Sequence, residues 1–99
     1  MNRTELKYEP GRIYSADQTG KIIAEVTFPR SRAGVVTINH TFVDPVLRGR
    51  GAAAKLMEAT AEALRSSGKK AELTCSYAIQ WFAQHKEFAD VLAANDKKM

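Results

Sequence analysis

The chain has almost no cysteine and no long apolar run, and both absences limit what kind of protein it is. Cys75 is the only cysteine in 99 residues, so no intrachain disulfide can form and a disulfide-stapled secreted scaffold is excluded. The amino-terminal sequence has no apolar core of signal-peptide length, and no segment approaches the roughly 18 apolar residues of a membrane span. We therefore expect a cytoplasmic protein with no membrane partner.

Neither sign of charge is in large excess. Fifteen Lys and Arg residues stand against eleven Asp and Glu residues, for a formal net charge of +4. This mild excess is weak support for a nucleic-acid partner, which remains the least favoured hypothesis. Two histidines and one cysteine, without ligand-like spacing, predict no metal site.

The composition is that of one folded domain. A hydrophobic content of 44% and a charged content of 26% are typical of globular chains, and this length has no room for a second core. We expect a single domain over 1–99, with a flexible, solvated tail at 95–99.

Residue periodicity predicts an α/β (α+β) fold, with a mostly antiparallel central sheet of about five strands and two main helices packed on it. The expected strands are Glu5–Glu9, Arg12–Asp17, Lys21–Phe28, Val35–Val43 and Ala71–Cys75. The expected helices run from Gly51 to Ser67 and from Ser76 to about Lys86, and 29–34 has the composition of a loop.

The two helices differ in what they bury. Apolar positions at helical spacing in the first helix are Ala53, Leu56, Met57, Thr60, Ala61 and Leu64, and Gly68 follows as a left-handed cap. In the second helix Ser76 is the expected cap and Ile79, Phe82 and Ala83 the expected inward face. Phe88, Val91 and Leu92 predict a last packed segment.

The stretch LRGRGAAAKL, 47–56, places two arginines and two glycines where a strand gives way to a helix. A helix start has about four unpaired N–H groups and a partial positive charge, and glycine lets an anion approach the backbone closely. The pattern predicts a diphosphate-sized anion site. It is neither a Walker loop nor a dinucleotide fingerprint, because it lacks the Gly-Lys-Ser/Thr ending and the G-x-G-x-x-G spacing.

Arg48, Gly51 and Ala53 form the pattern R-x-x-G-x-A, which resembles the acetyl-CoA signature of the GNAT N-acetyltransferase superfamily. The segments 40–43, 75–77 and 85–88 are similar to its small single-domain subgroup. The resemblance implies that acetyl-CoA, a small-molecule co-substrate, binds along Phe42 and Val43. Its pyrophosphate would lie on residues of the turn, and two aromatic residues would add contacts: Arg48, Gly49, Arg50, Gly51, Ala52, Ala53, Tyr77 and Phe82.

His40 has two open interpretations. Strand periodicity places it on the face of Val36, Ile38 and Phe42, where an imidazole is often a satisfied core histidine. In the resembled superfamily, however, this strand parts from its neighbour and the thioester enters the gap. There His40 could act as the general base for an incoming amine.

Cys75 ends the strand expected to border the same gap. It is either a small buried hydrophobe, or a lining residue of the thioester site, or a nucleophile that takes the acetyl group before passing it on. A nucleophilic thiol needs a nearby base or helix start, and His40 and the Ser76 helix could supply them.

One departure from the superfamily pattern N-x-x-A-x-x-x-Y bears on catalysis. Cys75, Ala78 and Phe82 stand at these spacings, so the tyrosine that protonates the departing thiolate is replaced by a phenylalanine. The leading hypothesis is a small acetyl-CoA-dependent N-acetyltransferase whose amine acceptor is a protein, a peptide or a polyamine. The alternative is a coenzyme A or acyl-CoA binding module with little catalysis.

Overall fold

The computed structural model describes residues 5–47, 49 and 51–93 of the chain. The arginines at 48 and 50 and the predicted tail at 95–99 lie outside the described residues. The described elements are β1 (Lys7–Glu9), β2 (Arg12–Ala16), β3 (Ile22–Thr27), β4 (Arg30–Arg32), β5 (Val35–Ile38), β6 (His40–Val43), η1 (Pro45–Leu47), α1 (Ala52–Ser67), β7 (Lys70–Leu73), α2 (Ser76–Gln84) and η2 (Lys86–Val91).

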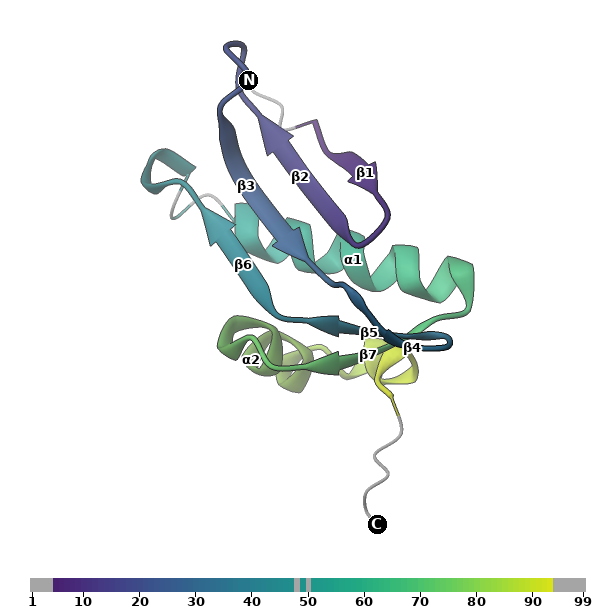
Figure 1. The fold of residues 1–99 in the computed structure, drawn as a ribbon. Coiled ribbons are helices and arrows are strands. Elements are labelled where there is room, and N and C mark those ends of the chain that lie inside the picture. The colour runs from purple at the N-terminus through teal and green to yellow at the C-terminus, as the bar shows by residue number, and fades with distance from the viewer. Residues whose placement is uncertain (1–4, 48, 50, 94–99) are drawn as a thin grey trace.

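The strands form two sheets rather than the single sheet of about five strands that the sequence predicts (Figure 1). Within the described residues, the four-stranded sheet has the order β1-β2-β3-β6, and each neighbouring pair is antiparallel. The three-stranded sheet has the order β4-β5-β7, in which β5 and β7 are parallel. The α/β class with mostly antiparallel pairing is confirmed. The predicted loop at 29–34 is wrong in part, because β4 pairs with β5 there.

The predicted strand Val35–Val43 is broken at Asn39, where the chain passes from one sheet to the other. The Asn39 N–H donates to the Thr27 carbonyl at 3.2 Å. The Thr27 hydroxyl in turn donates to Asn39 Oδ1 at 2.6 Å. These bonds join the chain to β3 at this point. Beyond it β6 pairs with β3, whereas β5 before it pairs with β7.

The long helix α1 covers one face of the four-stranded sheet (Figure 1). Its buried residues are Leu56, Met57, Thr60, Ala61 and Leu64, which confirms the predicted inward face apart from the half-buried Ala53. Beneath it the sheet contributes buried residues from alternate positions, Ile13, Ser15, Ala24 and Val26. Gly68 adopts φ 72°, and its N–H donates to the carbonyls of Arg65 and Leu64, so the predicted cap is also confirmed.

The second helix, α2, is rotated relative to the prediction. Its N-cap is Cys75 rather than Ser76, which is the first helical residue. It buries Ala78, Trp81 and Phe82, whereas Ile79 is 49% exposed and Ala83 is also exposed, so of the predicted inward face only Phe82 is confirmed. Trp81 packs edge-on to Phe82 at 5.0 Å, and its ring lies 5.6 Å from that of Phe88. Burying the large indole contributes more than burying Ile79, and this decides the orientation of the helix.

The segment η2 packs through Phe88 and Val91, as predicted, and is held to α1 by Arg65. The guanidinium donates to Asp90 through Nε at 2.9 Å and through Nη2 at 2.6 Å. It also donates to the Glu87 carbonyl and lies 4.6 Å from the centre of the Phe88 ring.

No helix of the described residues is long and apolar enough to cross a membrane.

The Arg65 contact predicts a pH-dependent contribution to stability. Hydrogen bonding to Arg65 lowers the pKa of Asp90 below its ordinary value. A carboxyl whose pKa is lower in the folded state stabilises the fold above its unfolded pKa of about 3.9 and loses this effect as the pH falls. We expect Asp90→Asn to lower the melting temperature at pH 7, and the difference from the wild type to shrink as the pH falls below the unfolded pKa of about 3.9. Glu58→Gln, at an exposed position of α1, is the control. A difference independent of pH would contradict the assignment.

Candidate active site at the strand split and the start of α1

The two sheets separate just beyond Ile38, and this separation creates the site. The Ile38 carbonyl accepts the N–H groups of both Thr74 and Cys75, at 3.1 Å each, and is the last point at which the two chain segments are bridged in this way. Beyond it β6 stays paired with β3, while the other segment turns into α2. The chain therefore opens between β6 and the start of α2.

A groove of about 380 Å³ lies beside this split. Its described lining comes from β6, the η1 turn, the start of α1 and the first turn of α2: Thr41, Val43, Leu47, Gly49, Gly51, Ala52, Ala53, Ala54 and Tyr77. A groove of about 540 Å³ lies between the β1–β2 turn and the C-terminal half of α1, lined among others by Gly11, Phe28 and Leu64. Only the smaller of the two contains a helix start, so we place the candidate site there.

The start of α1 is suited to bind an anion. Gly49 and Gly51 have φ of 81° and 76°, a left-handed conformation that favours glycine, and a Cβ at either would meet no atom within 4 Å. The first intrahelical bond runs from the Lys55 N–H to the Gly51 carbonyl. The N–H groups of 52–54, which precede it, have no acceptor within the helix. The first turn of α1 contains no acidic residue that would compete for them.

Asp44 shapes the loop that leads to the helix start. Its side chain accepts the N–H of Val46 at 3.0 Å, and its carbonyl accepts the N–H of Leu47 at 2.8 Å. Lys21 Nζ lies 3.4 Å from the Asp44 carboxylate and balances its charge. The turn therefore places Leu47 in the groove and leaves less negative charge beside an incoming anion.

Cys75 lies at the split, and its thiol contacts β6. Thr41 Oγ1 is 3.4 Å from Cys75 Sγ. Partial burial of the thiol raises its pKa. The hydroxyl of Thr41 and the backbone N–H groups of Ala78, Tyr77 and Thr41 lower it more, and the net effect is a pKa below the ordinary value. Cys75 is half-buried. Its lowered pKa favours the thiolate, which is the nucleophilic form.

His40 and Phe42 lie on the opposite face of β6 from Thr41 and Val43, because successive side chains of a strand alternate. His40 is exposed, so its interpretation as a core histidine is wrong. Its shared face with Val36 and Ile38, expected from periodicity, does not survive the break at Asn39. His40 makes no contact with Cys75 that would mark it as the base of that thiol.

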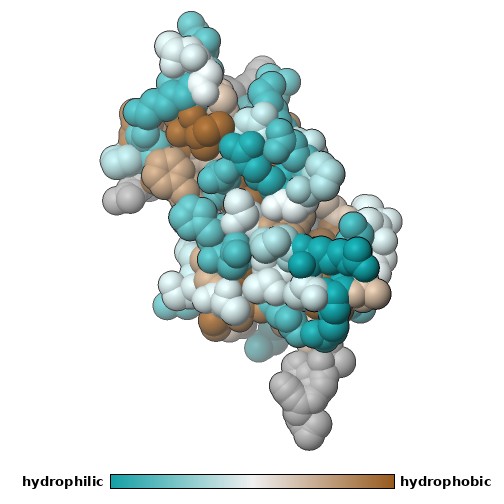
Figure 2. Space-filling view, in the orientation of Figure 1, coloured by the Kyte–Doolittle hydropathy of each residue, from teal (hydrophilic) through white to brown (hydrophobic). Residues whose placement is uncertain are grey.

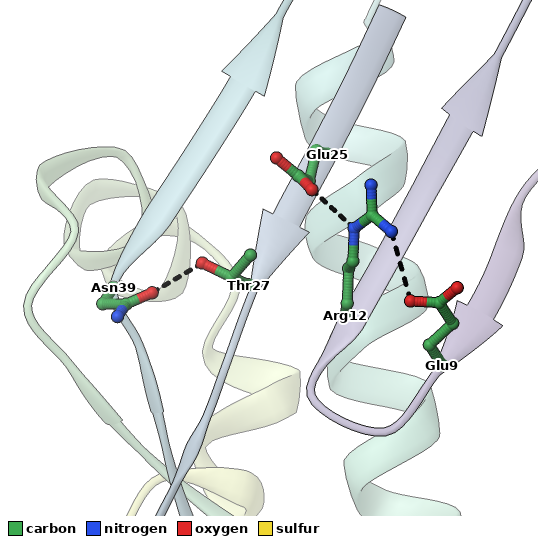
Figure 3. Close-up of polar contacts among 5 residues, drawn as sticks. All are labelled: Glu9, Arg12, Glu25, Thr27 and Asn39. Carbon is green, nitrogen blue, oxygen red and sulfur yellow. Dashed lines mark hydrogen bonds and ion pairs between the residues drawn. The ribbon is translucent and has the colours of Figure 1, made fainter. Parts of the chain in front are cut away.

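The face that carries His40 and Phe42 is not covered by α1, and Figure 2 shows it as mostly hydrophilic with one apolar patch at the upper left. The strand register arranges it in two rows, Glu9–Arg12–Thr27–His40 and Lys7–Tyr14–Glu25–Phe42. In Figure 3 Arg12 bridges Glu25, at 2.5 Å, and Glu9, at 3.1 Å, while Thr27 binds Asn39 at the sheet break. The two faces of β6 therefore differ, one lining the groove and one forming a polar surface.

Arg48 and Arg50 lie outside the described residues, and the other predicted cofactor residues separate into three groups. Val43, Gly49, Gly51, Ala52, Ala53 and Tyr77 come together in the groove. Phe42 lies on the other face of β6, and Phe82 is 4% exposed in the core beside Trp81, so neither lines the groove. Sequence reasoning missed Thr41, Leu47 and Ala54. Thr41 could have been found, because it stands two residues before Val43 and therefore on the same face of the strand.

Comparison with known families identifies the family of this chain. Residues 12–91 match the family described as GCN5-related N-acetyl-transferase. The chain belongs to this family. It is therefore an acyl-transfer enzyme, which favours catalysis over the alternative of a binding module alone.

Solved structures agree with this assignment. A GCN5-like N-acetyltransferase candidate from Staphylococcus aureus has a TM-score of 0.76 and 26% identity, with full coverage of both chains. An IAA acetyltransferase from Bacillus cereus has a TM-score of 0.57 and 18% identity over 75% of this chain. An acetyltransferase of the GNAT family from Staphylococcus aureus Mu50 has a TM-score of 0.56 and 15% identity over 80% of this chain.

The last two comparisons show the fold alone. The chain spans 52% of the Bacillus cereus enzyme and 49% of the Mu50 enzyme. Comparison with curated proteins gives no significant match. Enzymes of the family generally use acetyl-CoA. Among the described residues, no group of three or more His, Cys, Asp or Glu side chains could hold a metal ion.

Proposed function

We propose that the enzyme transfers an acetyl group from acetyl-CoA to an amine through Cys75. The observation that carries the proposal is the continuity of the groove, which runs from the helix start to Tyr77, beside the Thr41–Cys75 contact. The diphosphate would lie on the N–H groups of 52–54, with the predicted help of Arg48 and Arg50. The pantetheine arm would follow Thr41 and Val43 and bring the thioester to Cys75.

The proposed chemistry is a double exchange. The Cys75 thiolate attacks the thioester carbonyl, the bond to the coenzyme A sulfur breaks, and the acetyl group is then held as a thioester on Cys75. The acceptor amine attacks this carbonyl and loses a proton, and the Cys75 thiolate departs. Coenzyme A leaves as a thiol after taking a proton from water or from a group in the groove.

Tyr77 is the groove residue suited to donate a hydrogen bond to the departing sulfur. Burial raises the pKa of its phenol, so the hydroxyl remains protonated at neutral pH. Phe82 has no hydroxyl and is buried away from the groove. Tyr77 can in this way offset the absence of a tyrosine at 82.

We propose that the acceptor amine approaches from the polar face and that His40 takes its proton. His40 is exposed at the first position of β6, directly after the break at Asn39. Phe42 stands two residues further along the same face and would contact the acceptor side of the site, whereas its predicted contact with acetyl-CoA stays a prediction. A screen of amines, peptides and proteins would identify the acceptor class.

Titration calorimetry with acetyl-CoA tests the donor site. We expect binding that weakens roughly 10-fold to 150-fold in Arg48→Ala or Arg50→Ala, since a lost charge-assisted hydrogen bond costs about 1.5–3 kcal/mol. Lys86→Ala, at an exposed position outside the groove, is the matched control and should bind like the wild type. Absence of binding at millimolar acetyl-CoA would overturn the proposal, and unchanged affinity in both arginine variants would remove the arginines from the site.

A further inference from the structure

Thr41 stands across the strand split from Cys75 and belongs to a different element. It lies on β6, its side chain faces the groove together with Val43, and its hydroxyl oxygen is 3.4 Å from Cys75 Sγ. The pair is separated by 34 residues and is partly buried. The contact therefore depends on tertiary structure and places one hydroxyl beside the thiol.

The chemistry of the pair depends on the charge of the sulfur. A thiol and a hydroxyl can each donate to the other, but a thiolate can only accept. When Cys75 is ionised, the Thr41 O–H must be the donor, and hydrogen bonds to charged groups are stronger than those between neutral groups. The contact thus favours the thiolate over the thiol.

We propose that Thr41 is a positioning residue whose hydroxyl donates to the Cys75 sulfur, directs it into the groove and maintains its nucleophilic form. The effect on the thiol stands on the geometry alone. Its role in acetyl transfer rests on the proposed function.

Thr41 provides the side-chain hydrogen bond to the Cys75 thiol, and the groove beside it offers few other side chains that could do the same. The described lining of the groove consists of Thr, Val, Leu, Gly, Ala and Tyr residues, of which only Tyr77 titrates, and its pKa is raised. His40 is the nearest basic residue along β6 and lies on the opposite face of the strand. The other groups that favour the thiolate are backbone N–H groups, which side-chain substitution leaves in place.

The test measures the thiol directly, in the absence of acetyl-CoA. Cys75 is the only cysteine, so the rate of alkylation by iodoacetamide as a function of pH reports this residue alone. Thr41→Val keeps the shape of the side chain and removes the hydroxyl. We expect its alkylation profile to move upward by about one pH unit, with a rate near neutral pH roughly tenfold lower. Thr41→Ser, which keeps the hydroxyl, should stay near the wild type.

Thr37→Val is the matched control, since it makes the same change on β5 at a position paired with Glu72. Circular dichroism and melting curves establish that each variant is folded. A folded Thr41→Val protein with the wild-type profile overturns the proposal. A shift in Thr41→Ser as large as in Thr41→Val also overturns it, because the hydroxyl would then have no special part.

A second measurement links the pair to acetyl transfer. In Thr41→Val we expect the rate of acetylation of Cys75, measured at saturating acetyl-CoA, to fall about tenfold in parallel with alkylation. If acetyl-CoA does not bind the wild type, the proposed function fails while the alkylation result still decides the role of Thr41. If acetylation is normal and alkylation is unshifted, Thr41 is excluded and the proposed function stands.

Discussion

Cys75→Ala is expected to lower the rate of acetyl transfer by more than about a hundredfold, because removing the nucleophile of a covalent mechanism costs at least this much in characterised enzymes. Acetyl-CoA binding should be retained, since the groove is built from β6, the turn before α1 and the first turns of the two helices. Incubation with acetyl-CoA followed by mass spectrometry of the intact chain should show one acetyl group on the wild type and none on the variant.

The neighbouring residue supplies the matched control. Ser76→Ala changes an exposed side chain at the first position of α2 and should leave both the adduct and the transfer rate near the wild type. If Cys75→Ala binds acetyl-CoA and transfers acetyl at the wild-type rate, Cys75 only lines the site and transfer to the amine is direct. Such a result would leave the fold and the donor site unaffected.

Leu56→Ala is expected to destabilise the protein by about 2–5 kcal/mol, the range for truncating a fully buried leucine. Leu56 is 0% exposed and packs between α1 and the sheet, and alanine keeps the helix propensity of the position. A domain of this size has only about 5–15 kcal/mol of stability, so one such cavity removes a large share of it. Chemical denaturation gives the free energy of unfolding for both proteins.

Ile79→Ala is the control for that truncation. It also shortens an aliphatic side chain within a helix, but Ile79 is 49% exposed, so the loss should stay below about 1 kcal/mol. Equal losses in the two variants would contradict the assignment of Leu56 to the core and of Ile79 to the surface.

The glycine turn of the groove was predicted better from the sequence than the two faces of β6. The turn before α1 was predicted from arginine, glycine and a following helical period, all within about ten residues, and Gly49 and Gly51 indeed line the groove. Which side of β6 faces α1 decides that Thr41 lines the groove and that His40 is exposed. A residue pattern shows that two faces alternate, but it does not show which of them a helix covers once the strand changes sheets.

The sequence by itself determined the elements whose signals are local. These are the buried face of α1, its glycine cap at Gly68, the strands β2 and β3, and the glycine turn before α1, because helical period, capping and turn residues act within a few positions. Only the tertiary structure decided the break at Asn39, the orientation of α2 and the meeting of Thr41 with Cys75. The break and the Thr41–Cys75 contact each depend on a partner more than ten residues away, such as Thr27 for Asn39. The orientation of α2 depends on which of its sides packs against α1 and β7, and no local pattern specifies this.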